Sequence, residues 1–155
     1  MSQDDAGVDL ETSLGYLLKE ASSALRAAME AVLRPLGMTV THYSCLELLA
    51  QRPGLSNSEL ARGAFVTRQS MNVLLQTLER DGYVIRPAQA PVGKALPTRL
   101  TPRGRRSLAK ASAAVRSVEV RMLGGMTGAE QAAAYTVLRS MISSLRDPDE
   151  GQDSR

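Results

Sequence analysis

The sequence predicts a mainly α-helical fold with a small β-hairpin wing: a winged helix-turn-helix whose terminal helices form a dimerisation region. Three observations lead to this prediction. Apolar residues recur at helical spacing over most of the 155 residues. Two short helical patterns meet at a tight turn near the middle of the chain. A proline-rich stretch with strand-like texture, residues 83–101, follows them directly.

Composition limits the protein classes that remain open. The chain is long enough for one core, and 43% apolar with 23% charged residues is typical of a soluble globular protein. No run of about 18 apolar residues occurs, so we expect no membrane span. The acidic start "MSQDDAGVDL" lacks the parts of a signal peptide, and the single cysteine excludes an internal disulfide. These features favour a cytoplasmic protein.

Charge is unevenly distributed along the chain. Residues 53–106 carry nine Lys or Arg against three acids, a net charge of +6, while the remainder carries −3. A basic middle between slightly acidic ends favours a polyanionic partner for the middle. A solvated basic face without a partner is the alternative that charge alone leaves open.

Prolines, glycines and capping residues set the expected helices. The first helix covers residues 10–34 and ends at the Pro-Gly pair of "RPLG". The second follows Thr39 and stops at "RPGL". Ser56 opens a short third helix, because "SNSE" is a capping box in which Ser56 and Glu59 each bond a free backbone N–H.

The fourth helix has an unusual outward face. Thr67 caps it and Gly82 supplies its left-handed exit. One apolar stripe follows the spacing i, i+3, i+4, i+7 and comprises Met71, Leu74, Leu75 and Leu78. The opposite face carries amides, one valine and one arginine instead of a Glu/Lys mixture: Gln69, Asn72, Val73, Gln76 and Arg80.

A hairpin and two further helices complete the predicted order. "YVIRPAQ" and "ALPTRLT" flank "APVG", and a two-stranded edge hairpin tolerates their three prolines. Thr101 and Pro102 are a good N-cap and first residue for an Ala-rich helix that runs to about Leu123. A second capping box at residues 127–130 opens the last helix.

The second helix of a helix-turn-helix reads the major groove, and the outward face of the fourth helix suits that task. Amides bond adenine, arginine prefers guanine, and the methyl groups of Val73 suit thymine. Gln69 lies in the first turn, where this motif contacts bases. Thr67 and Ser70, with the free N–H groups of the helix start, suit a phosphate, and Arg68 could serve base or backbone. A polar face that merely lacks acids is the alternative.

Three motifs carry a resemblance to a known family: the second-helix pattern ending "RPGLS", the junction "LERDGYVIRP", and "LTPRGR" leading into the next helix. On these residues the chain resembles the MarR family of bacterial winged-helix regulators, and the similarity covers nearly all of it. The resemblance implies a wing whose tip enters the minor groove, often through an Asp-Arg-Arg run. The matching tip here reads Val92-Gly93-Lys94, so only Lys94 is basic there, while Arg86 and Arg99 remain on the strands.

The resemblance also implies a two-fold dimer built by the first helix and the last two. The apolar faces of these helices exceed what three short helices can cover. We therefore expect residues 10–38 and 102–146 to be dimerisation helices, 39–101 to be the winged helix-turn-helix DNA-binding region, and 1–9 and 147–155 to be a flexible N-terminus and tail. A homodimer requires a pseudo-palindromic operator with half-sites roughly 34 Å apart. A compact monomer with a helical cap is the alternative.

The resemblance further implies a small lipophilic or phenolic anionic effector, held in a cleft between the dimer helices and the DNA-reading part. By position Tyr16, His42 and Cys45 could face that cleft, and His42 or Arg116 could meet a carboxylate. His42 and Cys45 lie three apart, which leaves a nucleophile pair or a redox-sensing thiol open, but the apolar neighbours of Cys45 favour a buried core thiol. Two potential ligands are too few for a metal site, and no cofactor motif occurs.

These features predict a ligand-responsive, DNA-binding transcriptional regulator, a homodimer that acts as a repressor on double-stranded DNA and needs neither membrane nor cofactor. The absence of a Gly-rich phosphate loop or an acid pair argues against an enzyme. The sequence leaves activation open. Two alternatives also remain: a redox-sensing regulator acting through Cys45, and a winged-helix protein-interaction module that binds no DNA.

Overall fold

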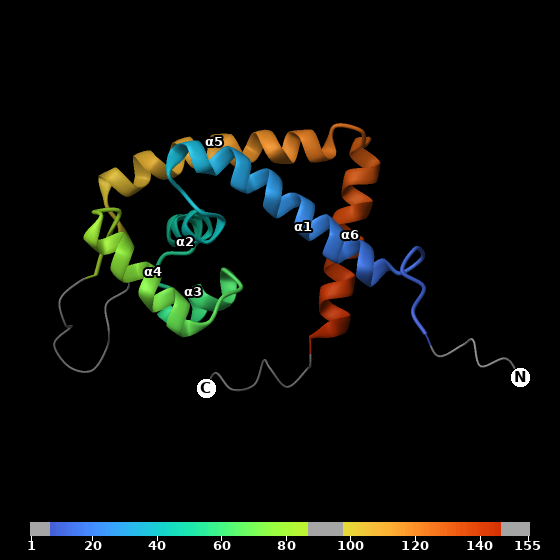
Figure 1. The fold of residues 1–155 in the computed structure, drawn as a ribbon, viewed down its shortest axis with the longest axis horizontal. Helices are drawn as coiled ribbons and strands as arrows, with labels where there is room; N and C mark the ends of the chain where they lie inside the picture. The colour runs from blue at the N-terminus through green and yellow to red at the C-terminus, as the bar shows by residue number, and fades with distance from the viewer. Residues whose placement is uncertain (1–6, 87–97, 147–155) are drawn as a thin grey trace, which may run out of the picture. The chain divides into compact units, whose positions relative to one another are not determined.

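The computed structural model describes residues 7–86 and 98–146 (Figure 1). Its elements are α1 Leu14–Leu33, the 3-10 turn η2 Arg34–Leu36, α2 Val40–Gln51, α3 Asn57–Gly63, α4 Arg68–Arg80, β1 Val84–Ile85, β2 Arg99–Leu100, α5 Pro102–Leu123 and α6 Gly128–Leu145. The predicted class is confirmed: mainly helical, with a two-stranded antiparallel hairpin between α4 and α5. Across the part of the chain that the structure describes, no helix is long and apolar enough to cross a membrane.

Side-chain caps determine where the central helices begin. The hydroxyl oxygens of Thr39 and Thr67 each accept a 3.1 Å hydrogen bond from a backbone N–H in the first turn of α2 and α4. The capping box at α3 forms as predicted, since Glu59 N donates to Ser56 Oγ at 3.2 Å and Ser56 N donates to Glu59 Oε1 at 3.1 Å. These bonds satisfy N–H groups that have no acceptor within their own helix.

The first helix starts later than the apolar spacing predicts. Ser13 Oγ accepts a 3.2 Å bond from Tyr16 N and sets the start of α1 at Leu14, whereas we expected a start near Leu10. Residues 9–12 form a turn in which Thr12 N donates to Asp9 O at 3.2 Å. A capping serine therefore overrides the apolar pattern, which continues into the turn but cannot extend the helix.

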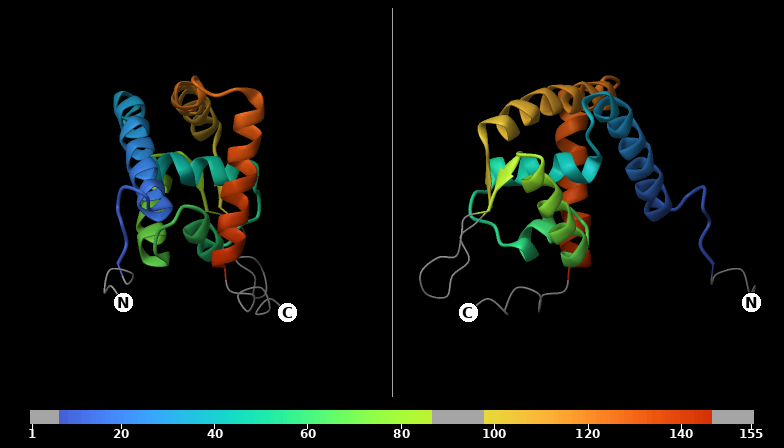
Figure 2. Two further views of the ribbon diagram at one scale, coloured as in Figure 1. Left: turned by 90° about the vertical axis from the view of Figure 1, so that its right-hand side faces the viewer. Right: turned by 60° about the vertical axis from the view of Figure 1, so that its left-hand side comes forward.

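One apolar core joins the end of α1 to α2, α3, α4, the hairpin and α5. Its fully buried large side chains are Leu33, Leu46, Leu60, Met71, Leu75, Leu78 and Cys45. Both views in Figure 2 show α2, α3 and α4 gathered together, and the right-hand view shows β1 beside the end of α4. The central helices are short because each needs only one apolar face to contribute to this core.

The hairpin is tied to the start of α5 by a small set of bonds. Val84 pairs with Leu100 and Ile85 with Arg99. Thr101 Oγ1 donates to Gly82 O at 2.6 Å and accepts from Gly104 N at 3.0 Å, so the predicted N-cap of α5 also holds the exit of α4. A side chain at Gly104 would place its Cβ 2.1 Å from the Tyr83 carbonyl oxygen, which makes glycine necessary there. The rest of the predicted hairpin, residues 87–97 with its three prolines and Lys94, lies outside the described residues.

Contacts within the chain group residues up to Val118 into one compact unit and residues from Glu119 into another. The second unit comprises the end of α5, a Gly-Gly turn and α6. Thr127 and Glu130 form the predicted capping box at the start of α6, with bonds of 3.0 and 3.1 Å. No residue of α6 is buried, and its exposed large apolar side chains are Tyr135, Val137, Leu138, Ile142 and Leu145.

Candidate nucleic-acid interface

Helix α4 is anchored on one side, as its sequence predicts. Met71, Leu75 and Leu78 have no exposed surface, and Leu74 packs against them from a partly buried position. Gly82, with φ of 80°, ends the helix in the left-handed conformation expected of it. The rotation of α4 about its own axis is therefore fixed by the core.

The opposite side of α4 is open to solvent along its length. Gln69, Val73 and Gln76 are exposed, and Val73 keeps 58% of its surface accessible. Such an amide–methyl–amide row can offer donors, acceptors and an apolar contact to base edges. Arg80 lies at the far end, where its Nε is 3.2 Å from Asp81 Oδ1 in an exposed pair. An exposed pair of this kind contributes little and can exchange for a phosphate.

The start of α4 is suited to a phosphate oxygen. Thr67 Oγ1 accepts from Ser70 N at 3.1 Å and its hydroxyl also pairs with Ser70 Oγ at 2.9 Å. Thr67, Arg68 and Ser70 are exposed. The first N–H groups of a helix carry partial positive charge, so hydroxyls, an arginine and this dipole converge here.

Asn72 takes a different place from the other polar residues of α4. It is half-buried, and its Oδ1 accepts a 2.7 Å bond from Asn57 Nδ2 of α3. Its backbone carbonyl accepts a 3.3 Å bond from the Arg86 guanidinium. Bidentate recognition of adenine needs the amide oxygen as an acceptor, and Asn57 already uses one of its two lone pairs, so the Asn72 amide is less free than that of Gln69 to turn toward a base.

The two arginines of the hairpin also differ. Arg86 is half-buried, and its backbone N–H donates to Glu79 Oε2 at 3.1 Å, so it is held against α4. Arg99 is exposed on β2 and lines a hollow of about 670 Å³ together with Thr98, Arg105 and the turn after α2. Of the two, only Arg99 has its charge open to a phosphate. Lys94 falls outside the described residues.

The residues expected to meet an effector are dispersed. Tyr16 is exposed on α1. His42 on α2 is half-buried; its ring meets Tyr83 edge-on with centroids 5.4 Å apart, and its Nε2 is buried with no hydrogen-bond partner among residues 7–86 and 98–146. Burial lowers the pKa of His42, against the opposing charge of Asp81. Arg116 is exposed on α5.

Cys45 is a core residue, as its apolar neighbours predicted. Its side chain is fully buried, and its Sγ lies 3.7 Å from Met71 Sδ. Burial raises the pKa of the thiol to about 12. A protonated, inaccessible sulfur cannot act as a nucleophile, is a poor redox sensor, and offers a ligand no surface to touch.

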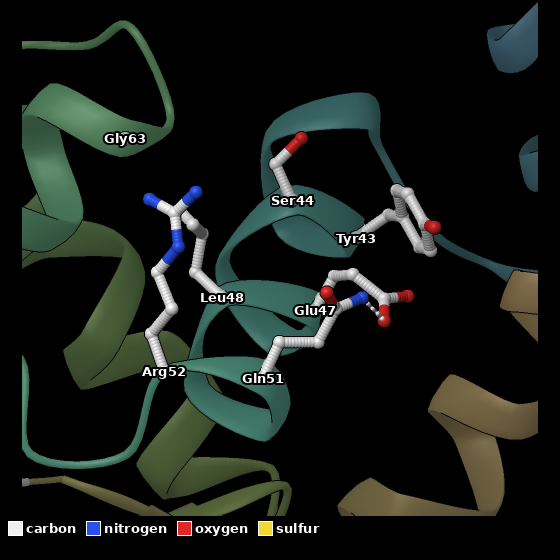
Figure 3. A pocket seen from close by; sticks show the side chains of 7 residues that line it. All are labelled: Tyr43, Ser44, Glu47, Leu48, Gln51, Arg52 and Gly63. Atoms are coloured by element: carbon white, nitrogen blue, oxygen red, sulfur yellow. Dashed lines mark hydrogen bonds between the residues drawn. The ribbon is translucent and has the colours of Figure 1, made fainter.

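The sequence analysis did not predict a pocket that the structure shows on α2. It has a volume of about 210 Å³ and is lined by Tyr43, Ser44, Glu47, Leu48, Gln51, Arg52 and Gly63 (Figure 3). Burial would raise the pKa of Glu47, but hydrogen bonds from Ser112, Gln51 and Tyr43, with the charge of Arg116, lower it. The signal was present in the sequence as a polar row on α2, in which Tyr43, Glu47 and Gln51 are four residues apart. Of the expected effector residues, only Arg116 acts on this pocket.

The comparisons with known proteins agree with this geometry. A MarR family model matches residues 36–95, from the end of η2 into the hairpin. The HTH-type transcriptional repressor Rv2887 of Mycobacterium tuberculosis is 45% identical over 137 residues, which cover 88% of this chain and 99% of that protein. The chain belongs to the MarR family. The family indicated by the three motifs is therefore confirmed.

Solved structures extend the match of this MarR-family chain to its fold. The crystal structure of Rv2887 in complex with p-aminosalicylic acid has a TM-score of 0.71 and 43% identity, covering 84% of this chain and 98% of that one. The crystal structure of Rv2887 in complex with DNA has a TM-score of 0.69 and 42% identity, with the same coverage of 84% and 98%. The winged-helix architecture predicted from the sequence is thus shared with a transcriptional repressor.

Proposed function

We propose that this MarR-family regulator is a homodimeric repressor that binds a pseudo-palindromic operator in duplex DNA and leaves it when a small aromatic carboxylate binds. The observation that carries the proposal is the exposed row Gln69, Val73 and Gln76 on a helix whose opposite side is locked into the core. The 45% identical Rv2887, a named repressor with structures in complex with DNA and with p-aminosalicylic acid, supports it.

The proposed contacts divide into base reading and backbone binding. Gln69 and Gln76 bond adenine edges, and Val73 contacts a thymine methyl. The backbone contacts come from exposed hydroxyls and arginines and from the wing tip: Thr67, Ser70, Arg68, Arg80, Arg99 and Lys94. Asn72 and Arg86 contribute indirectly, because they hold α4 and the hairpin in position.

The proposed dimer uses residues 10–38 and 102–146, leaving 39–101 as the DNA-binding region and 1–9 and 147–155 as tails. Exposed apolar side chains on α1 and on α6 support this division, because large apolar stripes are seldom left in water. Two copies of α4 would meet successive major grooves, roughly 34 Å apart.

The proposed effector response is a shift between two spacings of the paired DNA-binding regions. A ligand changes this equilibrium only by binding one spacing better than the other. Tyr16, His42 and Arg116 are the candidate contacts, whereas the buried thiol of Cys45 offers none. Titrating salicylate into wild type, His42→Ala and Arg116→Ala by calorimetry tests them, since unchanged affinities remove both residues from the effector site.

We further propose that the protein acts in the cytoplasm and catalyses no reaction. The enzyme alternative needs Cys45 as a thiolate, and burial with a pKa of about 12 opposes it. The same burial disfavours the redox-sensing alternative.

Selection of bound fragments from a random DNA pool tests the proposal as a whole. The expected result is one enriched sequence with two-fold symmetry, retained at moderate salt and released by salicylate. A purified protein that retains no duplex at low ionic strength would favour the alternative of a protein-interaction module.

A further inference from the structure

A chain of hydrogen bonds joins α3, α4 and the end of β1. It runs through Asn57, Asn72 and Arg86. Asn57 lies in the first turn of α3, Asn72 in the second turn of α4, and Arg86 directly after β1. The Asn57 amide donates to the Asn72 side-chain oxygen at 2.7 Å, and the Arg86 guanidinium donates to the Asn72 backbone oxygen at 3.3 Å. Residue 72 is therefore held from both sides at once.

A second hydrogen bond of Arg86 attaches it to α4 at another position. The Arg86 backbone N–H donates to the carboxylate of Glu79 at 3.1 Å, so the residue that follows β1 is bonded to α4 at positions 72 and 79. Positions seven residues apart lie about 10 Å apart along a helix axis. Two attachment points at that separation hold the end of β1 against α4 more firmly than a single attachment could.

From this geometry we infer that Asn57, Asn72 and Arg86 are positioning residues that hold β1 and α4 in the relative position that DNA binding requires, and that none of the three reads a base. The inference rests on the proposed DNA-binding function. The half-burial of Asn72 and Arg86 supports it, because a guanidinium that donates to a part-buried backbone carbonyl is not free to follow a phosphate.

A double-mutant cycle tests the link, read by fluorescence anisotropy on a duplex selected with the wild-type protein. Asn57→Ala and Asn72→Ala are each expected to weaken binding on the order of three- to tenfold, as one hydrogen bond gives, with the double variant no weaker than either single one. Both singles should keep the wild-type preference at every base pair. Additive losses, or a preference relaxed at one base pair by Asn72→Ala alone, would overturn the inference.

Two further variants distinguish a positioning role of Arg86 from the effect of its charge and from a general loss of protein stability. Arg86→Lys keeps the charge but cannot reproduce the planar guanidinium, so it should bind as weakly as Arg86→Ala. Ser112→Ala deletes a bond of similar length, 2.7 Å to Glu47, away from α4 and should leave affinity unchanged. Wild-type binding by Arg86→Lys, or an equal loss in Ser112→Ala, contradicts the inference. A wild-type protein that binds no duplex would instead refute the proposed function.

A separate observation concerns Phe65, the only phenylalanine of the chain. It lies in the turn between α3 and α4, two residues before Thr67, the cap of α4. Its side chain is 92% exposed and its φ is +58°, a left-handed conformation that costs a bulky residue about 1 kcal/mol or more. The turn holds it there, since Phe65 N donates to Arg62 O at 3.2 Å and Val66 N to Ala61 O at 3.0 Å.

An exposed aromatic side chain in a strained turn adds nothing to this core, whereas a partner that covers it would bury its apolar surface. The neighbouring Arg62 and Arg68 are exposed and basic, and the phosphate-binding end of α4 follows immediately. We propose that Phe65 packs against the deoxyribose edge of the DNA strand whose phosphate meets Thr67 and Ser70. This proposal too rests on the DNA-binding function, and it concerns affinity on every sequence rather than base choice.

Two substitutions test Phe65. Glycine adopts a positive φ freely, so Phe65→Gly should unfold at or above the wild-type midpoint yet lose affinity on the order of tenfold on selected and unrelated duplexes alike. Because the chain has no tryptophan, Phe65→Trp supplies a single reporter whose emission should change when DNA saturates the protein. Unchanged affinity in Phe65→Gly, or unchanged emission with DNA bound, overturns the proposal. An emission shift that depends on protein concentration without DNA would assign the contact to a second copy of the chain instead.

Discussion

Helices α4 and α6 present opposite surfaces to their surroundings. In α4 the apolar stripe of Met71, Leu75 and Leu78 is completely buried, and what remains exposed is mainly polar. In α6 no residue is buried, and Tyr135 and Leu138 belong to an apolar stripe that stays open. Burying apolar surface stabilises by roughly 25 cal/mol per Å², so an open stripe favours a protein partner, whereas an open amide row favours a hydrogen-bonding one. The difference supports the proposal that α6 contacts a second copy and that α4 contacts DNA.

The largest effect should come from disrupting the exposed apolar stripe of α6. Leu138→Glu combined with Ile142→Glu places two charges on the exposed stripe of α6, and the protein should become monomeric in sedimentation experiments. Loss of the second DNA-binding region should weaken operator binding by roughly a hundredfold or more. Ser140→Glu, on another face of α6, serves as the control and should leave the dimer intact. A dimer that survives both glutamates would show that α6 is not the interface.

Disrupting the exposed amide row of α4 should reduce DNA affinity by a smaller factor. Gln69→Ala removes one base-reading amide while leaving the core of α4 untouched. The expected loss is about 1–3 kcal/mol on the selected duplex, with binding to unrelated duplexes nearly unchanged. Competition anisotropy measures both. Equal losses on both duplexes would mean that Gln69 binds backbone and reads no base.

The salt dependence of DNA binding tests which residues around α4 contact phosphates. Arg99→Ala removes an exposed charge and should weaken all sequences alike, lowering the slope of log affinity against log salt by about one unit. Lys94→Ala should act in the same way. A slope equal to that of the wild type would remove the residue in question from the phosphate contacts.

The smallest effect should come from His42, near the junction of α2 with the end of α4. Burial holds the pKa of His42 below its usual 6.5, so the folded state disfavours the proton. Its contribution to stability is complete above pH 6.5 and is lost as pH falls toward the lowered folded-state value. Unfolding midpoints at about pH 7.5 and about pH 5.5 should differ more for wild type than for His42→Gln. An identical difference in both proteins would show that another group titrates.

Features that depend on neighbours in sequence were predictable. The caps at Thr39, Ser56 and Thr67, and the buried stripe of α4, follow from local hydrogen bonding and helical spacing. Burial of Cys45 also followed from its apolar neighbours. The start of α1 was predicted too early because the apolar pattern continues through the turn before Ser13, and only the cap marks the boundary.

Features that depend on contacts across the fold were not predictable. Asn72 and Gln76 look alike in sequence, yet only Asn72 faces α3, where Asn57 occupies its amide oxygen. Arg86 and Arg99 are likewise equivalent by type, and the pairing of Arg86 with an α4 carbonyl separates them. The α2 pocket around Glu47 depends on Ser112, which is 65 residues away in the chain. Sequence periodicity predicts which residues share one face of a helix, but it does not predict which other element packs against that face.

The central claim is that two copies of α4 read one duplex together. The most direct measurement is binding of the wild-type protein to its selected duplex and to the same duplex lengthened between the half-sites by about half a helical turn, roughly five base pairs. The account predicts two chains per selected duplex and near loss of specific binding to the lengthened one, because the second α4 would then face the wrong side of the DNA. One chain per duplex, or equal affinity for both duplexes, would contradict it.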